Sequence, residues 1–132
     1  MHILISGGQM ERVEGIFKAL ADSTRLRILN LLLREDACVC ELGSALGLPQ
    51  PMVSRHLACL RNAGLVLDHR EGMRVRYSLI LKDEFGGALE SLLREAFSCG
   101  LIYQEDIDKW DHQQGYSWEP LQPREKRQDA ST

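Results

Sequence analysis

Residues 38–80 read CVCELGSALGLPQPMVSRHLACLRNAGLVLDHREGMRVRYSLI, and the order of helix, turn and strand signals in this segment defines the architecture of the domain. Its first ten residues predict a short helix that ends at Gly47, because glycine readily adopts the left-handed conformation at a helix C-terminus. After a proline-flanked turn, apolar residues at helical spacing predict a second helix over residues 50–63. Two strand-like runs joined by Glu71 and Gly72 then predict a hairpin.

Three further helices are expected around this stretch. Helical spacing of apolar residues predicts one over residues 10–21 and another over residues 26–33, the second after an N-cap at Asp22 or Ser23. Asp83 is the expected N-cap of a helix that runs to about residue 98. We therefore expect a mainly α fold with a small β-hairpin, in which the hairpin is the wing of a winged helix-turn-helix.

A chain of 132 residues has the length of a single domain. We expect residues 1–9 to be a flexible leader, residues 10–99 to be the winged helix-turn-helix domain, and residues 100–132 to be an acidic, then polar, partly disordered tail. The sequence contains no run of about 18 apolar residues, so we expect no membrane-spanning helix. The N-terminus lacks the pattern of a signal peptide, so a cytoplasmic location with reduced thiols is expected. No phosphate loop or hydrolase motif is present, and we expect no enzymatic activity.

The second helix of the helix-turn-helix has the composition of a helix that reads DNA. On a helical wheel, Val53, Leu57 and Leu60 form the buried stripe, and small, hydrogen-bonding and cationic side chains lie opposite. Residues 50–80 carry five arginines against two acidic residues, a local charge of +3 in a chain of net charge −3. Contacts with double-stranded DNA are predicted for Gln50, Ser54, Arg55 and Arg61 in the helix and for Arg70, Arg74 and Arg76 in the wing. An alternative is a winged helix that binds only protein.

Cys38 and Cys40 are the best candidates for chemistry among the four cysteines. Residues two apart in a regular helix point about 200° apart, whereas in an extended segment they share a face. Both thiols can therefore hold one soft ion only if the helix start is non-helical or unwound. Acidic neighbours oppose thiolate formation, so the ligand itself is expected to drive deprotonation. The alternative is a pair of small buried residues without chemistry.

Four segments together resemble the ArsR/SmtB family of winged-helix metalloregulatory repressors. They are FKALADSTRLRILNLLL, CVCEL, LPQPMVSRHLACLRNAGLV and REGMRVRYSL. The resemblance implies a homodimer, built from the helices at 10–21 and 83–98, that releases operator DNA when it binds a metal or metalloid. It also implies DNA contacts at Gln50, Ser54, Arg55, His56, Arg70 and Arg74. A dimer is expected on physical grounds too, because one small domain can hardly cover Phe85, Leu92, Leu93 and Phe97.

The position of CVCEL resembles the arsenite-sensing branch of that family. The third cysteine common in that branch is replaced here by Gly43, so Cys99, Cys59, a partner-chain cysteine or a small thiol must supply any third sulfur. The resemblance also bears on the inducer, because the family's soft-metal variants add cysteines from the N-terminal arm and its zinc-sensing variants place histidines and acidic residues along the last helix. Residues 1–20 contain no cysteine and residues 83–98 no histidine, so the resemblance favours As(III) or Sb(III) as inducer over cadmium, lead or zinc. The predicted function is an arsenite-responsive repressor. The alternatives are a thiol redox-switched and a cadmium- or lead-responsive repressor.

Overall fold

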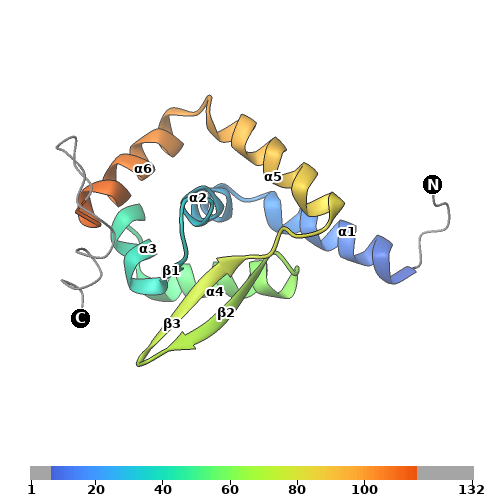
Figure 1. Cartoon of the computed structure of the whole chain (residues 1–132), viewed down its shortest axis with the longest axis horizontal. Coiled ribbons are helices and arrows are strands. Elements are labelled where there is room, and N and C mark those ends of the chain that lie inside the picture. Colours follow the sequence, from blue (N-terminus) through green and yellow to red (C-terminus); the bar gives the residue numbers. More distant parts are fainter. Residues whose placement is uncertain (1–6, 116–132) are drawn as a thin grey trace.

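In a computed structural model of the chain, residues 7–115 are described, with side chains from residue 11 onward. The described part is mostly helical with one small sheet (Figure 1). In chain order the elements are α1 (Gly7–Leu20), α2 (Ser23–Leu32), β1 (Ala37–Cys38), α3 (Val39–Leu46), α4 (Gln50–Asn62), β2 (Val66–Glu71), β3 (Arg74–Leu79), α5 (Glu84–Phe97) and α6 (Leu101–Gln113).

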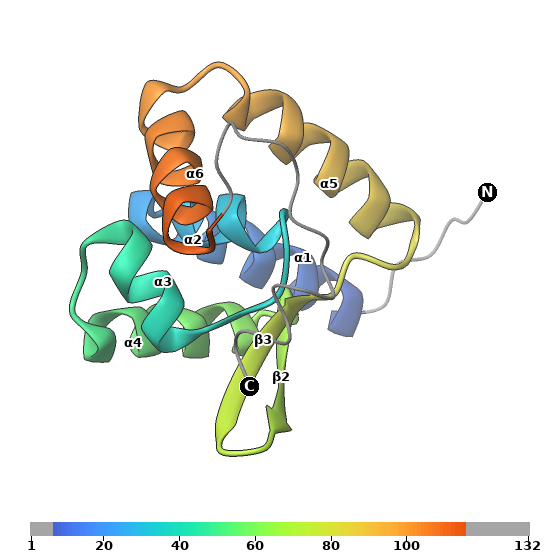
Figure 2. The ribbon, with the colours of Figure 1, turned by 60° about the vertical axis from the view of Figure 1, so that its left-hand side comes forward.

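The predicted helix-turn-helix and wing are confirmed. Gly47 follows α3 with φ 68°, the left-handed conformation expected at that position. Pro49 is the N-cap of α4, and Val53, Leu57 and Leu60 of this helix are fully buried. The hairpin of β2 and β3 turns at Gly72 and extends away from the helices as the wing (Figure 2).

The sheet has a third strand that the sequence did not reveal. Its order is β1-β3-β2, and all pairs are antiparallel. β1 contains only Ala37 and Cys38, which lie opposite Tyr77 and Arg76 of β3. Two residues are too few to show the alternation that identifies a strand, so only the tertiary pairing defines it. As a result, one of the candidate thiols belongs to the same sheet as the wing.

Both expected aspartate caps form, but the first helix starts early. Asp22 accepts a hydrogen bond from the Arg25 amide at 3.0 Å, and Asp83 accepts one from the Gly86 amide at 2.7 Å. α1 begins at Gly7, so residues 7–9 belong to the helix rather than to the expected leader. Glycine lowers helix stability without forbidding a helix, so it did not break this one. Residues 1–6 lie outside the described part.

The main correction concerns the expected C-terminal tail, because residues 101–113 form helix α6. Tyr103, Ile107 and Trp110 recur at helical spacing and pack against the core, and Trp110 is 1% exposed. The Asp106 carboxylate is also buried and accepts hydrogen bonds from Arg27 of α2. In the sequence, the many acidic residues between these apolar positions make the helical spacing difficult to recognise. Figure 2 shows α6 lying across α2 and α3.

Residues 116–132, the polar remainder of the expected tail, lie outside the described part. Across residues 7–115, no helix combines the length and the apolar character that crossing a membrane requires.

Candidate thiol site and nucleic-acid interface

α4 presents the predicted polar face to solvent. Gln50, Ser54 and Arg55 are exposed, while the opposite side of the helix is packed into the core. The buried stripe holds the helix in place against the core. This face offers an amide, a hydroxyl and a guanidinium, which are the groups that read base edges in a major groove.

Two other predicted DNA contacts on α4 already have protein partners. His56 is half-buried, and its Nδ1 lies 3.2 Å from Arg25 Nη1 and 4.0 Å from an Asp22 carboxylate oxygen. Arg61 Nη1 lies 3.3 Å from Asp68 of the wing. His56 thus joins α4 to the start of α2, and Arg61 joins α4 to β2.

The wing arginines fall into two groups. Arg70 and Arg74 are exposed near the turn of the hairpin, as a role in contacting phosphates requires. Arg76 differs from the expectation, because its side chain is only 23% exposed and its Nη2 donates to the Asp36 carbonyl at 2.7 Å. In this structure Arg76 contacts the segment that carries the cysteines.

The candidate thiols lie at the junction of β1 and α3. Cys38 is the N-cap of α3 with extended dihedral angles, φ −97° and ψ 166°, whereas Cys40 is the second residue of the helix. The predicted geometric condition is therefore met, since the helix begins only after Cys38. The two Sγ atoms are 3.0 Å apart. Two thiolates bound to one ion at about 2.3 Å, as in zinc sites, lie at most about 4.6 Å apart, so this pair can share one ion.

The Cys38 thiol is held in its neutral form. Burial raises its pKa to about 11, and the hydrogen bond with Cys40 and the charge of Glu41 add to this. The Glu41 amide opposes the rise by donating toward the sulfur. Cys40, by contrast, is exposed. A ligand therefore reaches Cys40 first and must remove the proton of Cys38 as it binds.

No third ligand for the cysteine pair comes from Cys59 or Cys99 in this protomer. Cys59 is half-buried and packs against the core from α4. Cys99 is exposed after α5, with its sulfur 3.7 Å from the Glu95 carbonyl. Within the described residues, no group of three or more His, Cys, Asp or Glu side chains is arranged to hold a metal ion. A third ligand therefore comes from outside the described residues of this protomer, for example from solution or from another chain.

The C-terminal end of α6 contacts the helix that carries Cys40. Gln113 Nε2 donates to the Glu41 carbonyl at 2.9 Å, and Gln114 Nε2 lies 3.4 Å from the Glu41 carboxylate. Nearby, Trp110 Nε1 donates to Glu35 at 3.1 Å. The sequence does not predict these contacts, because the acidic composition of residues 101–119 indicates a tail rather than a helix. The signal that could have found them is the helical spacing of Tyr103, Ile107 and Trp110.

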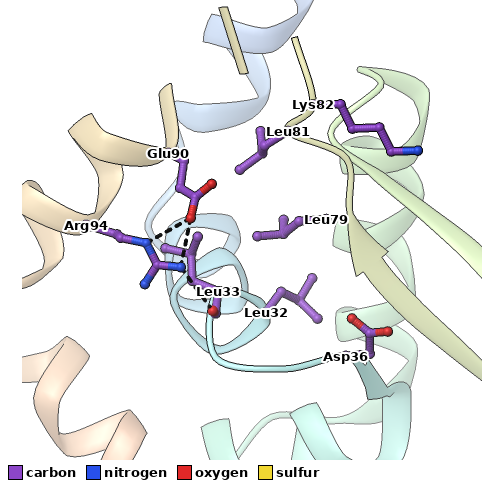
Figure 3. Close-up of a pocket in the computed structure, with 8 residues that line it drawn as sticks. All are labelled: Leu32, Leu33, Asp36, Leu79, Leu81, Lys82, Glu90 and Arg94. Carbon is purple, nitrogen blue, oxygen red and sulfur yellow. Dashed lines mark hydrogen bonds and ion pairs between the residues drawn. The ribbon is translucent and has the colours of Figure 1, made fainter. Parts of the chain in front are cut away.

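An open pocket of about 290 Å³ lies between α2, β3 and α5 (Figure 3). Leu79 and Leu81 line one wall, and a Glu90–Arg94 ion pair with a 2.8 Å contact stands on α5 opposite them. Asp36 borders the pocket near β1. The loop that leads into Cys38 is therefore not packed on all sides.

Apolar side chains remain exposed on α1 and α5, the helices expected to form a dimer. Phe17 is 53% exposed and Leu92 is 58% exposed, and Val13 is also exposed. Two other side chains expected to need a partner are covered within the protomer. Leu93 is buried, and Phe97 packs against Tyr103 of α6 with ring centroids 4.5 Å apart. The uncovered apolar surface is therefore smaller than the sequence suggested.

Comparison with known proteins assigns the family. The sequence profile of the family described as "Bacterial regulatory protein, arsR family" matches residues 22–67. The "Arsenic resistance transcriptional regulator ArsR1" of Pseudomonas putida is 51% identical over 77 residues, covering 55% of this chain and 60% of the relative. The "Arsenical resistance operon repressor" of Escherichia coli is 54% identical over 66 residues, covering 48% of this chain and 56% of the relative. The chain thus spans less than two thirds of the length of these relatives.

Solved structures share the same architecture. HlyU from Vibrio cholerae is 34% identical with a TM-score of 0.61, covering 70% of this chain and 99% of that chain. A "homodimeric winged helix-turn-helix DNA-binding domain" from Mycobacterium bovis, described as a possible ArsR-family transcriptional regulator, is 29% identical with a TM-score of 0.61 and covers 76% and 94% of the two chains. A further solved structure, described as an "ArsR family transcriptional regulator", is 32% identical with a TM-score of 0.52 and covers 64% of this chain and 91% of that chain. With its helix-turn-helix, its wing and these relatives, the chain belongs to the ArsR family of bacterial regulatory proteins.

Proposed function

We propose that this protein is a homodimeric transcriptional repressor that binds operator DNA and releases it when As(III) or Sb(III) binds Cys38 and Cys40. The single observation that carries the proposal is the 3.0 Å separation of two unpaired thiols at the entrance to the helix-turn-helix. The names of the arsenic-resistance relatives support the choice of inducer.

The DNA-binding half of the proposal rests on α4 and the wing. Gln50, Ser54 and Arg55 are exposed together on one face of α4, and Arg70 and Arg74 are exposed on the hairpin beside it. In a two-fold dimer formed through the exposed apolar side chains of α1 and α5, two such helices can enter successive major grooves about 34 Å apart. Arg61 and Arg76 then act mainly within the protein, because both guanidinium groups already contact other residues.

The chemistry of arsenite suits a thiol that holds its proton tightly. Arsenous acid carries three hydroxyl groups on trivalent arsenic. When each thiol sulfur forms a bond to arsenic, its proton leaves with one hydroxyl group as water, and the arsenic keeps its oxidation state. Two such exchanges use both cysteines and release two waters, and the third position keeps its hydroxyl or takes a thiol from solution. The raised pKa of Cys38 therefore does not prevent binding.

A titration with sodium arsenite under reducing conditions tests this function. The DNA is a fluorescent duplex enriched from a random pool by the wild-type protein, and anisotropy reports its release. We expect arsenite to release DNA from the wild type and not from the double variant Cys38→Ser, Cys40→Ser, which retains DNA binding. The matched control is Cys59→Ser with Cys99→Ser, which removes the two thiols that form no ligand group with Cys38 and Cys40 in the described structure, and it should respond as the wild type does. Release from the first double variant would place the sensor elsewhere.

The same 3.0 Å separation favours one alternative, a redox switch. Hydrogen peroxide would oxidise the two thiols to a disulfide and be reduced to two waters. Cys40 is the exposed sulfur that peroxide reaches first, but the high pKa of Cys38 slows attack by the second thiol. Adding peroxide in place of arsenite distinguishes the two functions. If peroxide releases the DNA and arsenite does not, the redox switch replaces the metalloid proposal. Cadmium or lead salts in the same assay test the alternative of a cadmium- or lead-responsive repressor.

A further inference from the structure

Arg76 lies where the wing meets the candidate thiol site. It is in the middle of β3, the strand that pairs with both other strands of the sheet. On one side it lies directly opposite Cys38 of β1, and on the other it lies opposite His69 of β2. One residue of the wing is thus in register with one of the two sulfur-bearing residues.

The Arg76 side chain strengthens this connection, because it makes polar contacts both with residues around the cysteines and with β2 of the wing. Its Nη2 donates to the Asp36 carbonyl at 2.7 Å, and its Nη1 lies 3.8 Å from Glu41 Oε1. Its Nε lies 3.6 Å from Glu71 at the turn end of β2. The planar guanidinium therefore bridges the cysteine segment and the hairpin, with donors in a rigid arrangement.

Glu41 connects the same guanidinium to the backbone of Cys38. Glu41 Oε1, the oxygen nearest to Arg76, also accepts a hydrogen bond from the Cys38 amide at 3.0 Å. Arg76 and Glu41 are both only about one-fifth exposed, so solvent screens their interaction less than that of a surface pair. A movement of the Cys38 backbone has to alter this carboxylate contact, the Asp36 contact, or both.

We propose that Arg76 is a positioning residue that transmits the state of the Cys38–Cys40 pair to the wing. This inference rests on the proposed function, because it describes how occupancy of that site reaches the DNA-binding surface. An arsenic atom bonded to both sulfurs imposes its own bond lengths and angles, and the extended residue Cys38 is the one that can move. The pocket beside Asp36 leaves room for that shift. Through Asp36 and Glu41 the shift moves Arg76, and β3 then repositions Arg70 and Arg74 relative to α4.

The test compares an arginine on the proposed route with one outside it. The measured quantity is the coupling ratio, which is the DNA dissociation constant with saturating sodium arsenite divided by that without it. Arg55→Gln is the matched control, because Arg55 is exposed on α4, which the proposed movement of the wing leaves in place. Both variants lose a positive charge, and a DNA contact that is lost equally with and without arsenite leaves the ratio unchanged. We expect Arg76→Gln to lower the ratio about five-fold or more, and Arg55→Gln to keep it within about two-fold.

Two further readouts separate transmission from a purely structural role. Arsenite affinity, followed by the ultraviolet absorbance of the arsenic–sulfur bonds, should stay near the wild-type value in Arg76→Gln. Arg76→Lys keeps the charge but not the planar fork, so its coupling ratio should lie between those of the wild type and Arg76→Gln. Equal ratios in Arg76→Gln and Arg55→Gln would overturn the inference.

Hydrogen exchange of the DNA-free wild type covers the case in which Arg76→Gln does not fold. We expect arsenite to change amide exchange in residues 74–79, and Glu41→Gln to weaken that change. A wild type that binds arsenite and releases DNA with unaltered exchange in β3 would overturn the transmission route and leave the proposed function intact. A wild type that does not bind arsenite would overturn both.

Discussion

Replacing Asp106 with alanine tests whether α6 is a stable part of the domain. The Asp106 side chain is 1% exposed, and its two oxygens accept hydrogen bonds at 2.8 and 2.9 Å from Nε and Nη2 of Arg27. The Arg27 side chain is 20% exposed, and the bond to Asp106 raises its pKa further. Asp106→Ala leaves this guanidinium partly buried without its carboxylate.

The magnitude follows from how deeply the pair is buried. Removing one partner of a buried ion pair costs about 3–5 kcal/mol, because the remaining charge is no longer compensated. Arg27 keeps partial access to water, which places the expected loss in the free energy of unfolding near the lower limit, about 3 kcal/mol. The same helix offers a control in Asp111, whose contact of 2.8 Å with Arg34 is much more exposed. For Asp111→Ala we expect a loss of at most about 1 kcal/mol.

Urea unfolding monitored by circular dichroism measures both losses. All variants are compared at one protomer concentration, because the stability of a dimer depends on concentration. Similar slopes of unfolding free energy against urea would show that the same surface is exposed in each case. Asp106→Ala costing no more than Asp111→Ala would refute the docking of α6 and with it the contacts of Gln113 and Gln114 with Glu41.

Two more predictions concern the DNA face and the thiols. Arg55→Ala should weaken DNA binding by about 1–3 kcal/mol and relax base preference, since Arg55 is exposed on α4, and Arg61→Ala should cost less because Arg61 already contacts Asp68. Anisotropy with the enriched duplex measures both, and a larger loss for Arg61 would reverse our orientation of the helix. In rapid alkylation followed by mass spectrometry at pH 8, iodoacetamide should modify Cys40 well before Cys38, whose labelling should rise only as the pH approaches about 11. Because the folded pKa is raised from 9.0, Cys38 stabilises the fold below about pH 9 and loses that contribution as the pH rises through 11. Equal labelling rates at pH 8 would contradict the burial of Cys38.

Local patterns were enough to predict the helix-turn-helix and its wing. Apolar spacing in α4 identified which face is buried, and Gly47, Asp22 and Asp83 marked helix ends by properties of their own backbone or side chain. The hairpin turn at Gly72 is equally local. Such features depend on residues a few positions apart, so they can be read from the chain itself.

α6 was missed for a different reason. Its acidic residues suggest a solvated tail, but the Asp106 carboxylate forms an ion pair with Arg27, a residue 79 positions away in the chain. The chain order alone does not show that this charge is buried beside a cation. The cost of burying the carboxylate is offset only once α2 and α6 are in contact.

Local sequence patterns predict that a short helix, a turn, an exposed cationic helix and a basic hairpin follow one another, and that two cysteines lie at the start of the short helix. The folded domain adds that this helix begins after Cys38, that Cys38 pairs with the wing strand, and that Arg76 turns toward the cysteines rather than remaining exposed like Arg74. These contacts could not be predicted, because a two-residue strand has no periodicity of its own. Its conformation comes from the hydrogen bonds that β3 offers across nearly 40 residues of chain, and these form only when the domain folds.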